Sequence, residues 1–287
     1  MEFGSLSELT SKGAAALAKG PVCVILAEDD TALDATIQHH CNAGFETLLL
    51  ALPSGVAAPT DLPDNVHQVH TSERTSAFTT DVVNTVIALL KPGTWLSYVY
   101  NAEFLFTPFS EHRSVGEALH FCTEERRASI LCFVVDLYAA DFNRSPSGVD
   151  LEDAYLDNKG YYALERRRDG EIMERQLNFH GGLRWRFEEH IAKDRNRIDR
   201  AALFRTAPGL QLRPDHTLSD EELNTYECPW HNSMTASITS FRAAKALASN
   251  PGSRAMINSF WWHNSQRFEW RAQQLMDMGL MEPGQWF

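Results

Sequence analysis

Short apolar runs alternate with segments of helical spacing through the first half of this chain, and that alternation limits the folds open to it. Continuous apolar runs are typical of strands that are buried on both faces. The runs are Val22–Ala27, Glu46–Leu52, Val66–His70, Trp95–Phe106 and Ala128–Tyr138, and the helical segments between them include Thr31–Cys41, Phe78–Leu90 and Ser114–Thr123. Strand and helix in alternation predict an α/β fold, with a mostly parallel central sheet and helices on both faces.

The character of the sequence changes near residue 143. Residues 143–157 are polar and rich in turn formers, and Lys159–Arg175 is strongly charged. Further on, Ser237–Ala248 and Ser253–Met278 have helical spacing. We therefore expect an α/β half at residues 1–142 and a mainly helical, loop-rich part at residues 143–287, joined in one continuous globular unit.

The glycine motifs of common nucleotide-binding folds are missing from the sequence. The first apolar run is followed by Glu28-Asp29-Asp30 rather than by Gly-x-Gly-x-x-Gly, and no Gly-x-x-x-x-Gly-Lys-Ser/Thr occurs. The sequence thus disfavours a standard dinucleotide-binding fold and a phosphate-loop NTPase. A nucleotide would have to be held in another way.

Charge and cysteine content narrow the functional classes. The formal net charge of −12 argues against nucleic-acid binding, which normally needs a basic face. The five cysteines have no Cys-x-x-Cys spacing, and several lie in apolar surroundings, so reduced core thiols and a cytoplasmic location are expected. No apolar run approaches the roughly 18 to 20 residues of a membrane span, so we expect no transmembrane segment.

The first half resembles a known family. An apolar strand, an Ala27-Glu28-Asp29 turn, a His39-His40 pair and Gly44-Phe45 follow one another, and a Trp-led strand then ends in Tyr100-Asn101-Ala102-Glu103-Phe104. This order is similar to a bacterial branch of the family-2-like glycosyltransferases, which have the nucleotide-sugar-binding fold called GT-A. The resemblance covers roughly residues 21–138, and the later Gly-Gly-Leu-Arg-Trp-Arg segment is also similar to some members.

The resemblance implies a metal site that this sequence carries only in part. The branch has Asp-x-Asp-Glu-Phe at the end of the Trp-led strand, and here Tyr100 and Ala102 stand in place of the two aspartates. An Asp-x-Asp pair supplies oxygen ligands to a divalent cation, which offsets the charge of a leaving diphosphate. Glu103 is the one carboxylate that remains. If Mn²⁺ or Mg²⁺ binds at all, Glu103 and His231 are the expected ligands, and Glu103 is also a candidate catalytic residue.

Donor contacts are expected from two turns that follow apolar strands. Glu28, Asp29 and Asp30 come directly after the first strand, where this fold brings the base or ribose, and Tyr100 and Asn101 end the Trp-led strand. Ligands of open α/β sheets bind outside the carboxyl ends of the strands. The alternative for the three acidic residues is a solvated helix N-terminus, which favours negative charge.

Asp136 lies at the end of the apolar run Ala128–Tyr138. A carboxylate there is a candidate general base for an acceptor hydroxyl, provided that burial raises its pKa. The alternative is a capping residue or an ion-pair partner for a nearby arginine. The residues alone leave both interpretations open.

Four residues of the second half are candidates for the donor diphosphate and sugar. In a strand, Arg184 and Arg186 would point to one face and could clamp a diphosphate; the alternative is an ion-pair pattern with Glu188 and Glu189. His231 could support the phosphates, and Trp230 could stack on a sugar ring.

Taken together, these features predict a hexosyltransferase-type enzyme. It would move a sugar from a nucleotide-sugar donor to a hydroxyl of a glycan or other acceptor, and metal dependence is left open. The alternative is a non-catalytic relative that binds a glycan or a partner protein through the same cleft, as the substituted Tyr100 and Ala102 suggest.

Overall fold

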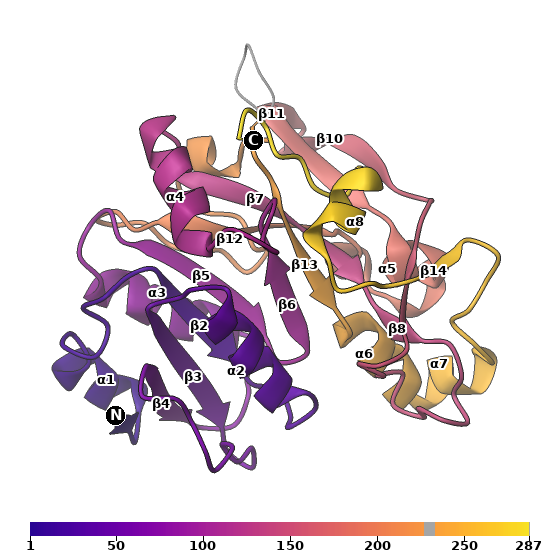
Figure 1. Cartoon of the computed structure of the whole chain (residues 1–287), viewed down its shortest axis with the longest axis horizontal. Helices are drawn as coiled ribbons and strands as arrows, with labels where there is room; N and C mark the ends of the chain where they lie inside the picture. Colours follow the sequence, from indigo (N-terminus) through magenta and orange to yellow (C-terminus); the bar gives the residue numbers. More distant parts are fainter. Residues whose placement is uncertain (227–232, 287) are drawn as a thin grey trace. The chain divides into compact units, whose positions relative to one another are not determined.

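The computed structural model describes residues 1–226 and 233–286 (Figure 1). The chain divides into two compact units, and each draws on both halves of the sequence. Unit 1 comprises Met1–Leu105, His112–Leu131 and Ala201–Asn224, and unit 2 comprises Phe106–Glu111, Cys132–Arg200 and Thr225–Phe287.

Unit 1 is built on four parallel strands in the spatial order β4-β3-β2-β5 (Figure 1). Their bounds are β2 (Val22–Leu26), β3 (Thr47–Pro53), β4 (Val66–Thr71) and β5 (Trp95–Tyr100). The short β1 (Glu2–Phe3) pairs with the outer edge of β4, and the last three residues of β12 (Asp199–Arg205) pair antiparallel with β5. Every residue of β2, β3 and β5 is buried, as the apolar runs predict.

The same unit contains the helices α1 (Leu6–Lys12), α2 (Leu33–Asn42), α3 (Phe78–Leu89) and α4 (Val115–Glu124). Helix α3 buries Phe78, Val82, Val83 and Val86, a spacing that places them on one face. Helix α4 begins with a capping box, in which Ser114 and Glu117 satisfy each other's backbone N–H groups. The three helices predicted for the first half are thus confirmed to within two residues at each end.

Unit 2 holds the end of β7 (Ser129–Asp136), which pairs parallel with β13 (Ala236–Ser240) so that Asp136 lies beside Ser240. Strands β10 (Tyr162–Arg168) and β11 (Glu171–His180) form a hairpin, and β8 (Tyr138–Ala139), β9 (Ala154–Asp157) and β14 (Ser265–Arg267) form a small sheet. The helices are α5 (Gly182–Arg186), α6 (Arg242–Ser249), α7 (Pro251–Met256) and α8 (Ala272–Asp277). Tyr138, Leu183, Leu247 and Phe260 form much of the apolar core around them.

The α/β class is confirmed, because among residues 1–226 and 233–286 the main sheet is mixed, mostly parallel and nine-stranded, with β6 (Glu103–Phe106) among its members. The prediction of a mainly helical second half is wrong. The segment Ser237–Ala248 contains strand β13 before helix α6, and Ser253–Met278 contains β14 between two short helices. Both segments are apolar at intervals that suit a buried strand as well as a helix, so periodicity alone misassigned them.

No helix in residues 1–226 and 233–286 has both the length and the apolar character needed to cross a bilayer.

Candidate functional site

The order of the parallel strands in unit 1 reverses between β2 and β5. Strand β3 follows β2 in sequence and lies on one side of it, whereas β5 lies on the other side. Leu26, the last residue of β2, is directly paired with Tyr100, the last residue of β5. The two turns that leave these strands therefore start side by side, at the position where open α/β sheets bind ligands.

Asn101 ties these two turns together. Its Oδ1 accepts a hydrogen bond from the Glu28 N–H at 2.8 Å. Its Nδ2 donates to Asp29 Oδ1 at 2.7 Å and to the Thr31 carbonyl at 3.0 Å. Asn101 is fully buried, so its carboxamide holds the acidic turn in one conformation rather than reaching into solvent.

The three acidic residues after β2 have different surroundings. Asp29 is partly buried and bonded to Asn101, while Asp30 is exposed. Glu28 Oε1 lies 2.8 Å from Arg74 Nη1, an arginine on the loop that follows β4. Arg74 was not predicted as a site residue, because it lies in a polar loop without a motif and is brought to Glu28 only by the order of the strands.

The turn between β5 and β6 is clamped from several directions. Glu103 is fully buried, and its Oε2 accepts a hydrogen bond from the Tyr100 N–H at 2.9 Å. Ala102 has a left-handed backbone with φ of 59°, and its N–H donates to Thr36 Oγ1 on α2 at 2.9 Å. His39, also on α2, is bonded through Nε2 to the Leu105 carbonyl at 2.7 Å. Helix α2 thus holds the Tyr-Asn-Ala-Glu segment in a conformation that costs a non-glycine residue free energy.

The predicted metal ligands are not brought together in the described residues. No three His, Cys, Asp or Glu side chains gather in a way that could hold a metal ion in residues 1–226 and 233–286. Glu103 bonds within its own turn, and His231 lies outside the described residues, as does Trp230. The possibility of metal binding stays a prediction.

Two tyrosines on one face of β5 contact a loop histidine. Tyr98 OH lies 3.0 Å from His216 Nδ1, and the two rings are stacked. Tyr100 meets the same imidazole edge-on, and its hydroxyl lies 2.6 Å from Thr79 Oγ1 on α3. The spacing of Tyr98 and Tyr100 along the strand could have indicated that they share a face. Their contact with His216 could not be predicted in the same way, because more than a hundred residues of sequence separate the partners.

In unit 2, Asp136 at the end of β7 caps the start of α5. Its Oδ2 accepts a hydrogen bond from the Arg184 N–H at 3.2 Å, and Arg184 Nη2 lies 3.5 Å from Oδ1. Oδ1 itself has no hydrogen-bond partner among the described residues. Burial raises the Asp136 pKa to about 6, against the lowering effect of Arg184. Asp136 therefore makes both the cap and the ion pair of the structural alternative, and it also has the raised pKa that a general base requires.

The expectation that Arg184 and Arg186 lie in a strand and share one face is wrong, because both belong to the short helix α5. Gly182 begins this helix with φ of 63°, which a β-strand does not allow. The two arginines consequently bind different carboxylates: Arg184 pairs with Asp136, and Arg186 pairs with Asp157 at 3.0 Å.

Asp157 is a buried carboxylate that the sequence analysis missed. Tyr138 OH donates to its Oδ1 at 2.5 Å, and Trp262 Nε1 donates to the same atom at 2.7 Å. Arg186 completes the set and also donates to the Phe260 carbonyl at 2.6 Å. Asp157 and these three partners come from four separate segments of the chain, and no local motif around Asp157 indicates the contacts.

Replacing Gly182 by alanine is expected to disturb Asp136. An added Cβ would lie 3.0 Å from Asp136 Oδ2 and 3.2 Å from its Cβ, and the left-handed φ adds strain. We expect a loss of about 1–3 kcal/mol in the free energy of unfolding, measured by urea denaturation. Gly170→Ala is the matched control: its φ is 91°, but an added Cβ would meet no atom within 4 Å. Equal losses in both variants would show that backbone strain alone, and not contact with Asp136, sets the cost.

No protein-family model matches this chain, and no curated protein is significantly similar to it in sequence.

Proposed function

We propose that the protein is a glycosyltransferase that moves a sugar from a nucleotide-sugar donor to a hydroxyl acceptor. The observation that carries the proposal is the pair of polar turns at the strand-order reversal of unit 1, joined by Asn101. Ligands of open α/β sheets bind at such a reversal, and the ordered motifs of the first half resemble a nucleotide-sugar-binding family. The proposal therefore rests on a general rule of the fold class together with a resemblance in sequence.

The acidic turn offers acceptors for a nucleoside. The carboxylates of Glu28 and Asp29 can accept hydrogen bonds from ribose hydroxyls or from a base N–H. Since Asn101 holds this turn in place, little ordering is left to be done on binding, which favours affinity. Arg74, now paired with Glu28, carries a positive charge of the sign that a diphosphate needs.

In the proposed reaction, the bond between the donor sugar and the diphosphate breaks and the acceptor oxygen forms the new bond to the sugar. The acceptor loses its proton, and the proposed base is Asp136. General base catalysis of this kind contributes about 10²- to 10⁴-fold. We expect Asp136→Asn to lower kcat by a factor in this range while leaving nucleotide affinity unchanged, and a kcat within twofold of the parent would remove Asp136 from the mechanism.

Calorimetric titration with UDP, GDP and their hexose conjugates tests the donor site, with Mn²⁺ and again with EDTA. We expect saturable binding of one nucleotide series, weakened about tenfold or more in Asp29→Asn, as for loss of a charge-assisted hydrogen bond. Asp64→Asn is the matched control, because Asp64 is exposed and precedes β4 at the opposite end of that strand. If no nucleotide binds, or if both variants bind equally well, the donor site is not at this turn.

A non-catalytic binding protein is the second candidate, and the surroundings of Glu103 favour it. This carboxylate is fully buried and bonded to the Tyr100 N–H, and no aspartate stands at position 100 or 102. Release of nucleoside diphosphate from a donor by the purified protein separates the two candidates. Turnover that is lost in Asp136→Asn supports the enzyme, whereas donor binding without any turnover supports the binding protein.

A further inference from the structure

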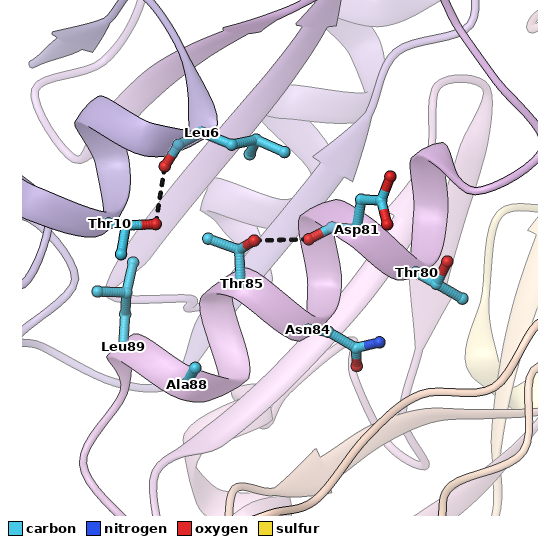
Figure 2. Close-up of a pocket in the computed structure, with 8 residues that line it drawn as sticks. All are labelled: Leu6, Thr10, Thr80, Asp81, Asn84, Thr85, Ala88 and Leu89. Atoms are coloured by element: carbon cyan, nitrogen blue, oxygen red, sulfur yellow. Dashed lines mark hydrogen bonds between the residues drawn. The ribbon is translucent and has the colours of Figure 1, made fainter.

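A groove of about 590 Å³ lies between helices α1 and α3 of unit 1, and its lining includes none of the residues of the proposed donor site (Figure 2). Its walls combine apolar and polar side chains. The lining residues are Leu6 and Thr10 from α1 and Thr80, Asp81, Asn84, Thr85, Ala88 and Leu89 from α3. The groove is wide open to solvent rather than enclosed.

The hydroxyl hydrogens of this groove are already used inside the helices. Thr10 Oγ1 donates to the Leu6 carbonyl at 2.8 Å, and Thr85 Oγ1 donates to the Asp81 carbonyl at 2.7 Å, as the dashed lines of Figure 2 mark. Thr80 likewise donates to the Ala77 carbonyl at 2.9 Å. A hydroxyl whose hydrogen is already engaged in a hydrogen bond still has lone pairs, so the three threonines present hydrogen-bond acceptors to a ligand.

The remaining polar groups strengthen this character. The Asp81 side chain is exposed and has no hydrogen-bond or ion-pair partner among the described residues, and an ionised carboxylate only accepts. Asn84 exchanges two hydrogen bonds with the main chain of Leu212, at 2.7 and 3.1 Å, which leaves one amide hydrogen. The lining contains no lysine, arginine or histidine. The groove therefore offers a negative charge and several acceptors but almost no donors.

We propose that the groove between α1 and α3 binds an alkylammonium ligand, of the class of aliphatic diamines and polyamines. An ammonium group has three N–H donors and a positive charge, which match Asp81 and the threonine oxygens. The methylene chain of such a ligand packs on the apolar side chains of Leu6, Ala88 and Leu89 (Figure 2). Anionic ligands are excluded by Asp81 and by the missing donors.

The test compares 1,6-diaminohexane with hexamethonium, in which both nitrogens carry the same charge but no N–H. Calorimetry at 150 mM NaCl limits non-specific attraction to this acidic protein. We expect saturable binding of the diamine and at least about tenfold weaker binding of hexamethonium, because the hydrogen bonds to the acceptors are lost. Amide shift changes in NMR spectra should be confined to α1, α3 and their immediate neighbours.

Variants separate the groove from general electrostatics. Asp81→Asn is expected to weaken diamine binding about tenfold, and Thr85→Val, which removes an acceptor at nearly constant volume, about three- to tenfold. Asp61→Asn is the control: it makes the same charge change at an exposed loop position outside the groove and should bind like the parent. The proposal is overturned if no saturable diamine binding occurs, if hexamethonium binds equally well, or if Asp61→Asn weakens binding as much as Asp81→Asn.

Discussion

Replacing Arg186 by methionine is expected to lower the free energy of unfolding by about 3–5 kcal/mol, the range for a buried ion pair that loses one partner. The side chains of Arg186 and Asp157 are 10% and 0% exposed. Without the guanidinium, Asp157 keeps its bonds from Tyr138 and Trp262 but remains a buried carboxylate with no opposite charge in contact. Loss of the stacking of Arg186 on the Trp262 ring adds to the cost.

A double-mutant cycle distinguishes this charge effect from lost packing. Asp157→Asn alone leaves Arg186 buried without its counter-charge, so it too is expected to be costly. The double variant Asp157→Asn/Arg186→Met contains neither charge, and it should cost at least 1 kcal/mol less than the sum of the single changes. Strict additivity would mean that the two side chains stabilise the fold independently, contrary to the paired geometry.

Arg167→Met is the matched control for the same substitution at the surface. Arg167 pairs with Glu165 at 3.2 Å on the hairpin of the same unit, but both side chains are more than half exposed. Ion pairs of this kind contribute about 0–1 kcal/mol. Urea denaturation followed by circular dichroism should therefore resolve the two arginine variants, and similar midpoints would contradict the special role given to Arg186.

The parallel strands of unit 1 could be predicted because their information is local. Continuous apolar runs such as Val22–Leu26 have few alternatives to a doubly buried strand, and the helices between them have clear spacing and caps. In the second half, short strands such as β13 are flanked by apolar helical residues. There the choice between strand and helix depends on pairing with a distant partner, β7, and a single sequence does not contain that pairing.

The location of the candidate site could be predicted from the sequence, because strand ends can be recognised there. Glu28, Asp29, Tyr100 and Asn101 were singled out because polar residues follow apolar strands, and the structure brings their two turns together. That Asn101 would bond to the acidic turn, rather than face a ligand, depends on the register of β2 against β5. Register arises from packing of the whole sheet, so the sequence indicated the place but not the bonding.

The pH dependence of stability gives a second large effect, and it arises from Asp136. The folded-state pKa of this carboxyl is about 6, above its ordinary value of 3.8, mainly because of burial. Between these values the folded protein binds a proton that the unfolded chain has released. Stability therefore falls as the pH rises through this window, by roughly 3 kcal/mol in total, because each pKa unit corresponds to about 1.4 kcal/mol.

Asp136→Asn should remove this dependence, because an amide does not titrate. Relative to the parent, the variant is expected to gain about 2 kcal/mol of stability from pH 4 to pH 7, most of it below pH 6, whatever constant offset the substitution brings. Urea unfolding at half-unit pH intervals measures the difference, with the exposed Asp194→Asn as a control that should follow the parent curve. A difference that stays constant over this range, or that shrinks as the pH rises, would mean that the Arg184 guanidinium and the backbone N–H groups of α5 outweigh burial. The carboxylate would then be held ionised as a cap, and its proposed role as a base with a raised pKa would lose its physical ground.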